Sequence, residues 1–270
     1  MKGQVKFLHA ADIHYSRDKQ EQALQSLDVL ARTAVQEKVD LIIIAGDLFD
    51  RPVNNTASSG FPGLINVIQD LMNIAPVVAV TGTPTHDIPG CYEPFKKIKS
   101  HHGFTILEAG QDYFLGSEGM VWNGDPIDAD RSRLLLFGIP EISKQYFLKD
   151  KQLGQAEADE AIKKGMRELL LGLAAIRKQH PDIPCVLVYH GMVAGATLSN
   201  NQVMPAGGIQ LGKDDLALVG VDYYALGHVH KAQQIEGLPA YYSGSAFPVD
   251  WGEQDLKCFN IVEIGEDQHE

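Results

Sequence analysis

The sequence predicts an α/β protein whose strands form a largely parallel sheet. Residues 41–45 are five apolar residues, three of them Ile, which is typical of a strand buried on both faces. Predicted strands and helices alternate through short links over residues 5–80, the pattern of βαβ units. Polar residues follow the ends of several strands, where ligands of open α/β sheets bind.

The first 80 residues contain the clearest elements. Apolar runs bounded by polar residues predict buried strands at 5–10, 41–45 and 77–80. Between them, apolar residues recur at helical spacing and predict two amphipathic helices, over 19–37 and around 64–71. The order strand, helix, strand, helix, strand favours parallel pairing of the three strands.

Shorter patterns predict the rest of the chain. Strands are expected at 104–107, 133–139, 185–189, 223–226, 233–235, 240–243 and 257–264. Helices are expected at 92–100 and 157–179. Residues 191–212 contain many Gly and Asn and are long enough for a functional loop. Because no repeat or linker interrupts the pattern, we expect a single domain over residues 1–270, with no capping domain evident.

Composition places the chain among ordinary globular proteins, with 44% hydrophobic and 21% charged residues. No apolar run reaches the roughly 20 residues of a membrane span, and no signal peptide precedes the first strand. Cys91, Cys185 and Cys258 are too few for a disulfide framework or a thiolate zinc site. We therefore expect a cytoplasmic protein with no membrane partner. The formal charge of -12 disfavours a broad nucleic-acid-binding face.

Side chains that bind metals follow five separate strand ends: Asp12 and His14, Asp47, His86 with Asp87, His190, and His228 with His230. In Asp-x-His and His-x-His, both side chains lie on the same side of an extended segment and can reach one cavity. Imidazole and carboxylate together suit manganese, iron or zinc. Two such ions that share a carboxylate can hold a phosphoryl group and activate a water molecule.

Each of these residues has a plainer alternative when taken alone. A single buried His is more often a hydrogen-bonded structural residue than a ligand, and Asp50 has the position of a turn residue. We assign that structural role to the remaining histidines: His9, His101, His102, His180 and His269. The structural interpretation does not explain the set as a whole, because five separate strand ends would have to carry metal-binding residues by chance.

These motifs resemble those of the calcineurin-like metallophosphoesterases, in the same order: Asp12-Ile13-His14, Gly46-Asp47-Leu48-Phe49-Asp50, His86-Asp87, His190-Gly191 and Gly227-His228-Val229-His230. The Gly-Asp-Leu-Phe-Asp form and the stretch from Gly227 to Ser245 are similar, more narrowly, to SbcD-type DNA repair exonucleases. The resemblance implies a four-layered αββα sandwich with a dinuclear metal site on one edge.

The resemblance also implies a role for each residue. One metal would be held by Asp12, His14, Asp47 and His230, and the second by Asp47, His190 and His228, with Asp47 bridging. His86 would lie beside the scissile phosphate and stabilise the transition state or protonate the leaving oxygen. Asp87 would orient the ring of His86.

The chain departs from the family pattern in two places. The family has Gly-Asn-His-Asp where this chain has Gly82-Thr83-Pro84-Thr85-His86-Asp87, so the Asn amide that would bind the second metal is missing. Since neutral Thr is a poorer ligand for a hard cation, we expect the second metal to bind more weakly than the first. The capping domain and the helical segment that docks the ATPase partner of such nucleases are not evident.

Three functions follow from the residues and the resemblance. The favoured one is a manganese-dependent nuclease that acts on DNA ends, with DNA as substrate and an SbcC-type ATPase as partner. Arg17, Arg51 and Lys231 adjoin the motifs and are candidate phosphate contacts. The alternative is a phosphodiesterase or phosphatase for a small molecule. A non-catalytic scaffold is disfavoured, because binding alone would not require His86 and six ligands.

Overall fold

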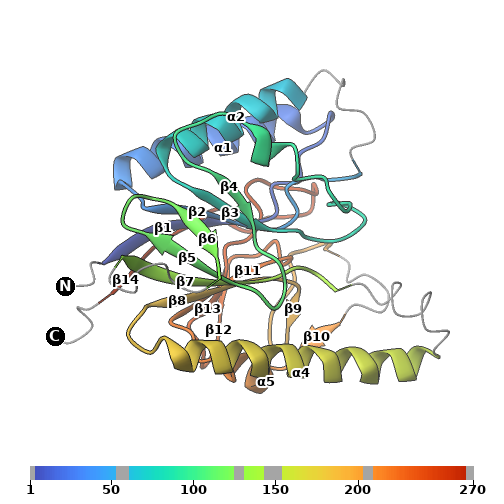
Figure 1. Cartoon of the computed structure of the whole chain (residues 1–270). Helices are drawn as coiled ribbons and strands as arrows, with labels where there is room; N and C mark the ends of the chain where they lie inside the picture. The colour runs from blue at the N-terminus through green and yellow to red at the C-terminus, as the bar shows by residue number, and fades with distance from the viewer. Residues whose placement is uncertain (1–3, 53–60, 125–130, 143–153, 203–208, 266–270) are drawn as a thin grey trace.

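Two β-sheets pack face to face, and helices cover the outer face of each, so that the chain forms four layers (Figure 1). The computed structural model describes residues 4–52, 61–124, 131–142, 154–202 and 209–265. This arrangement confirms the αββα sandwich that the sequence implied. None of the helices in these ranges is long and apolar enough to cross a membrane.

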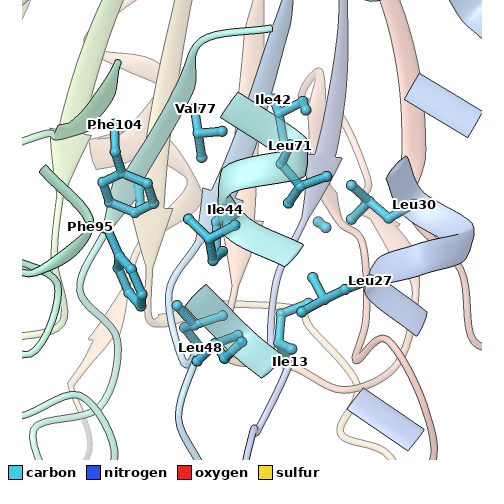
Figure 2. Close-up of a cluster of buried hydrophobic side chains, with 14 of the residues drawn as sticks. Ile13, Leu27, Leu30, Ile42, Ile44, Leu48, Leu71, Val77, Phe95 and Phe104 are labelled. Carbon is cyan, nitrogen blue, oxygen red and sulfur yellow. The ribbon is translucent and has the colours of Figure 1, made fainter. Parts of the chain in front are cut away.

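The first sheet has five strands in the order β14-β1-β2-β3-β4. Their bounds are Asn260–Ile264, Val5–Ala10, Leu41–Ala45, Val77–Val80 and Phe104–Ile106. Strands β1 to β4 are parallel, and β14 pairs antiparallel with β1. Helices α1 (Gln20–Glu37) and α2 (Phe61–Ile74) cover its outer face. Figure 2 shows Leu27 and Leu30 of α1 and Leu71 of α2 beside Ile42 and Ile44 of β2.

The second sheet has seven strands in the order β12-β13-β11-β8-β7-β5-β6. Their bounds are Gln233–Ile235, Ala240–Tyr242, Tyr223–Gly227, Cys185–His190, Ser132–Ile139, Asp112–Gly116 and Val121–Asn123. Strands β7, β8, β11 and β13 are parallel. The long helix α4 (Gln155–Gln179) and the short helix α5 (Lys213–Ala217) lie against its outer face. Beside it, β9 (Met192–Val193) pairs with β10 (Gln210–Leu211).

Strand β2 lies at the centre of the molecule. Ile42 and Ile44 face the helices, whereas Leu41, Ile43 and Ala45 face the second sheet. All five side chains are fully buried, as the continuous apolar run predicts. Burial of one Ile side chain contributes about 1.5–3 kcal/mol, so this strand anchors both halves of the core.

The sheets are aligned so that the carboxyl ends of β2, β8 and β11 meet. His190, at the end of β8, donates from Nδ1 to the carbonyl oxygen of Ala45, at 2.7 Å. Gly227, at the end of β11, lies so close to the same carbonyl that an added Cβ would collide with it. Polar residues that follow parallel strands of two different sheets are therefore brought to one edge.

Several elements differ from the sequence prediction, among them β9 and β10, which lie within the loop expected at 191–212. The helix expected at 92–100 is only a 3₁₀ turn, η1 (Phe95–Lys97), and the backbone is extended again at Ile98. The hairpin of β5 and β6 was not predicted, since its strands are short and weakly alternating. Helix α5 was also missed, and the strand predicted at 257–264 begins at Asn260. None of these changes moves a motif away from its strand end.

Candidate metal centre

The turns that carry the motifs have unusual backbone geometry. Asp12, His14, Asp47 and His228 have φ angles of 53°, 46°, 49° and 97°, a region that L-residues rarely adopt. Such conformations cost about 1–3 kcal/mol each and are found where the surrounding structure holds a functional group in place. Here the first two turns hold each other: Asp12 N donates to Gly46 O and His14 N to Asp47 O, both at 3.0 Å.

Two glycines allow the close approach of these turns. At Gly46, where φ is +85°, an added Cβ would collide with the ring of His190. At Gly82 it would collide with the carboxylate of Asp47. Neither position admits a side chain, so the glycines bring β2, β3 and β8 together at the site.

The first cluster of candidate ligands is formed by Asp12, His14 and His230, whose ligand atoms all lie within 4.8 Å of one another. The Nε2 atoms of His14 and His230 are 3.0 Å apart, a separation that two ligands of one ion can have when each bond is about 2.0–2.1 Å long. Glu253 Oε1 lies 2.6 Å from His230 Nδ1. A carboxylate only accepts there, so Nδ1 carries the proton and Nε2 keeps its lone pair for a metal.

Asp47 lies between the two clusters and is almost fully buried. Its Oδ1 accepts from Thr83 N at 2.6 Å, and its Oδ2 lies 3.0 Å from His86 Nδ1 and 3.3 Å from His190 Nε2. It also groups with Asp12 and His190 as a possible ligand set. Its position therefore suits the bridging carboxylate that the sequence predicted.

The second cluster is formed by His190, His228 and Glu141. His190 is fully buried; its Nδ1 donates to Ala45, but its Nε2 has no hydrogen-bond partner among the described residues. The 3.3 Å approach of this Nε2 to Asp47 lacks hydrogen-bonding geometry. A buried polar atom without a partner is costly in a folded protein, and a metal ion would satisfy this one.

Charge interactions within the metal-free cluster are strong. Burial alone would raise the pKa of Asp47, but the charge of His190 and the hydrogen bond from His86 bring it well below its usual value. Burial lowers the pKa of His190, yet the charge of Asp47 outweighs it and raises that pKa to about 10. Binding of a divalent ion would displace the proton of His190 and neutralise the charge of the carboxylates.

His86 and Asp87 occupy different places in the site. Burial would lower the pKa of His86, but the hydrogen bond and charge of Asp47 raise it. The carboxylate of Asp87 instead accepts from Phe49 N at 3.1 Å, from Gly82 N at 2.9 Å and from the Tyr92 hydroxyl. The sequence prediction that Asp87 orients the His86 ring is therefore corrected: Asp47 contacts the ring, and Asp87 fastens the loop to the Asp47 turn.

Comparison with known proteins identifies the family. The model of the calcineurin-like phosphoesterase family matches residues 5–232. The chain belongs to this family. Members of it are metal-dependent phosphoesterases. The residues present here fit divalent metals, since the buried Nε2 of His190 has no hydrogen-bond partner among the described residues and the Nε2 atoms of His14 and His230 face each other at 3.0 Å.

Individual relatives of this calcineurin-like phosphoesterase are distant. It is 25% identical to the SbcD component of the nuclease SbcCD of Rhodobacter capsulatus, over 92% of this chain and 64% of that protein. It is 24% identical to the corresponding SbcCD component of Staphylococcus epidermidis, over 98% of this chain and 67% of that protein. The chain thus spans about two thirds of their length. GAP50, described as the anchor in the inner membrane complex of Plasmodium, has the same fold, with a TM-score of 0.53, 15% identity and coverage of 96% of this chain and 81% of that one.

All eight predicted residues lie in this one site, and two further acids join them. Glu141 follows β7, a strand that the sequence predicted, so the same search of strand ends would have found it. Glu253 follows no strand end or motif, and its place beside His230 is visible only in the structure. Asp50, interpreted as a turn residue, has Oδ1 3.6 Å from His14 Nδ1 and 2.7 Å from Lys19 Nζ.

Proposed function

We propose that this calcineurin-like phosphoesterase is a dinuclear-metal phosphodiesterase, and more narrowly a manganese-dependent nuclease that acts on DNA ends in repair. The observation that carries the proposal is that six ligand-type side chains lie in overlapping clusters at one site: Asp12, His14, Asp47, His190, His228 and His230. The two distant relatives named as nuclease components support the narrower part. The chain spans only about two thirds of the length of these relatives, so a DNA substrate and an ATPase partner are proposed for it and not inferred directly from their names.

The roles follow from the two clusters. Asp12, His14 and His230 would hold one ion and His190 and His228 the other, and Asp47 would be a ligand of both. When bound, such ions stabilise charge on a phosphoryl group and activate a water molecule for attack. His86 has its Nδ1 against Asp47, which leaves Nε2 to donate a proton to the leaving oxygen.

The charges near the site bear on how DNA would bind. Arg51 pairs with Asp50 at 3.4 Å and with Asp18 at 3.7 Å, and Lys231 lies 3.9 Å from Asp255. Two of the three candidate phosphate contacts, Arg51 and Lys231, are thus shared with an acid, on a chain with a formal charge of -12. We propose that a partner, of the SbcC ATPase type, supplies most of the phosphate contacts. Free Cys91, Cys185 and Cys258 fit the reducing cytoplasm in which such a complex would act.

A small-molecule substrate is the second candidate, and one observation favours it. A cavity of about 400 Å³ opens beside the loop that follows β3. Asp87 and Glu141 form part of its wall, so it borders the metal centre. Its volume is within the range of small-ligand sites.

The test is an assay of the manganese-loaded chain on single-stranded DNA, on duplex ends and on a generic phosphodiester. Nuclease activity that disappears in Asp47→Asn supports the proposal, because that variant removes the shared carboxylate. Good turnover of the small phosphodiester with no cleavage of either DNA shifts the function to the second candidate. No turnover of any of the three, with both ions bound, contradicts an enzymatic role.

A further inference from the structure

The second cluster contains an acid that the family pattern does not supply. Glu141 lies two residues after the end of β7, and its Oε2 is 3.4 Å from His228 Nδ1 and 3.7 Å from His190 Nε2. The ligand atoms of these three residues lie within 4.8 Å of one another. Its side chain is mostly buried, at 16% exposure, so the carboxylate faces the cluster more than water.

The fold itself brings this acid to the site. β7 pairs parallel with β8, with Ile139 opposite Tyr189, so residues just after β7 lie beside those at the end of β8. Glu141 N also donates to Thr81 O, at 3.4 Å, which ties the turn to the loop after β3. This is the same loop in which Thr83-Pro84-Thr85 replaces the family's Asn. Glu141 therefore lies beside the loop from which the family's Asn amide is missing.

A second observation points to a missing ligand between these residues. The Nε2 of fully buried His190 has no hydrogen-bond partner among the described residues, and Asp47 and Glu141 are the acids that lie beside it. Its Nδ1 donates to Ala45, so in the neutral ring the lone pair is on Nε2, and this nitrogen is the one that can bind a metal once its own proton is released. A buried polar atom without a partner is costly in a folded protein, and an ion at this point would satisfy this one.

Thr83 does not fill that place. Its hydroxyl lies 2.8 Å from Glu141 Oε2 and 3.1 Å from Asp47 Oδ2. A hydroxyl has one proton, so it can donate to only one of these two carboxylates at a time. Thr83 thus holds the two acids in position, and lone pairs of both remain for a cation.

We propose that Glu141 is a ligand of the second metal, together with Asp47, His190 and His228, in place of the family's amide. The inference rests on the proposed dinuclear site and adds a ligand to it. A carboxylate attracts a hard divalent cation more strongly than a neutral amide does. The second metal therefore binds at least as tightly as the first, which reverses the weaker second site expected from the loss of Asn.

The alternative is that Glu141 only accepts a hydrogen bond from His228. In that case it orients a ligand, and its loss lowers metal affinity by about 10–100-fold without removing an ion. Metal stoichiometry separates the two roles, because only the loss of a ligand empties the site at an ion concentration that still fills the other one.

Manganese is titrated into the metal-free full chain by calorimetry. Two further measurements are made: the metal content after gel filtration, and the electron paramagnetic resonance signal of an exchange-coupled manganese pair. Glu141→Ala is compared with the wild type, with Glu141→Gln, which restores an amide of the same shape, and with His190→Ala. Glu168→Gln is the matched control, because Glu168 is an exposed acid on α4 that pairs with Lys164.

We expect two ions and the pair signal in the wild type and in Glu168→Gln. Glu141→Ala should bind one ion and lose the pair signal, and Glu141→Gln should bind the second ion more than tenfold more weakly. If His190→Ala binds one ion but both Glu141 variants keep two with unchanged affinity, the role of Glu141 is wrong while the dinuclear site stands. One ion in the wild type overturns the dinuclear site as well. Should Glu141→Ala fail to fold, Glu141→Gln is titrated in its place, and two ions bound with wild-type affinity in that variant would overturn the role of Glu141.

Discussion

The Nδ1 atom of His190 lies 2.7 Å from the carbonyl oxygen of Ala45. This hydrogen bond joins the end of β8 in one sheet to the end of β2 in the other. Since a carbonyl can only accept, Nδ1 carries a proton, and Nε2 is directed to the side of Asp47 and Glu141. A single contact therefore aligns the two sheets and sets the direction of a candidate ligand.

His86 is expected to affect the rate more than the metal content. Replacement by Ala should lower turnover by about 10²–10⁴-fold if the ring transfers a proton to the leaving oxygen. Turnover is measured on a phosphodiester with a poor leaving group, and bound manganese is measured in the same preparation. Because His14, Asp47 and His86 also group as a possible ligand set, an equal loss of manganese would make His86 a ligand instead. Unchanged turnover would exclude both roles.

Glu253 is expected to act through His230. Its Oε1 lies 2.6 Å from His230 Nδ1, and its Oε2 contacts Lys257 Nζ at 2.5 Å, so the acid holds the ring in one tautomer and one orientation. Glu253→Gln should weaken binding of the first metal by about 10–100-fold and leave the second unchanged. Manganese titration of Glu253→Gln and of Glu141→Gln shows whether each substitution weakens only one of the two metal sites. Equal weakening of both ions in Glu253→Gln would show that the two sites are not independent.

His9 is expected to make the protein less stable in weak acid. Its ring is fully buried beside Tyr223 and Asn260, and burial lowers its pKa from 6.5 to about 3. Below 6.5 the unfolded chain binds a proton that the folded chain does not, so the free energy of unfolding falls by about 1.4 kcal/mol for each pH unit until the folded pKa is reached.

The measurement is denaturant unfolding of the wild type and of His9→Asn over this pH range, with a chelator present so that metal loss does not contribute. The variant is expected to be less stable near neutral pH, because the Asn side chain is smaller. Its stability should nevertheless fall less steeply with acid. Parallel slopes in the two proteins would show that His9 takes up its proton in the folded state.

DNA is expected to bind the isolated chain weakly and with little dependence on salt. The shared charges of Arg51 and Lys231 leave roughly two or three phosphate contacts, each adding about 0.9 to the slope of log affinity against log salt. Binding of the metal-loaded chain is measured against salt, with Arg51→Ala and Lys231→Ala alongside. Tight binding with a steep slope would reveal a basic face that the sequence and these contacts do not indicate.

Much of the fold and most of the site follow from local patterns. The apolar run at 41–45 predicts a central strand because burial on both faces leaves no position for a polar residue. Parallel strands of one sheet place their carboxyl ends at one edge, so His190 and His228 could be grouped from the sequence alone, whereas Asp47 joins them because two sheets pack together. Glu141 could have been predicted as a site residue in the same way, since it also follows a predicted strand.

The remaining contacts were decided by tertiary structure. The sequence indicates that the loop with Thr83 lacks an amide ligand. It does not indicate that a turn from the other sheet places Glu141 beside this loop. Asp87 was expected to face His86, yet it contacts Phe49, because a buried carboxylate must satisfy the nearest backbone donors. Such choices depend on which loops of distant segments meet in space, whereas strands and the residues at their ends depend on neighbours in sequence.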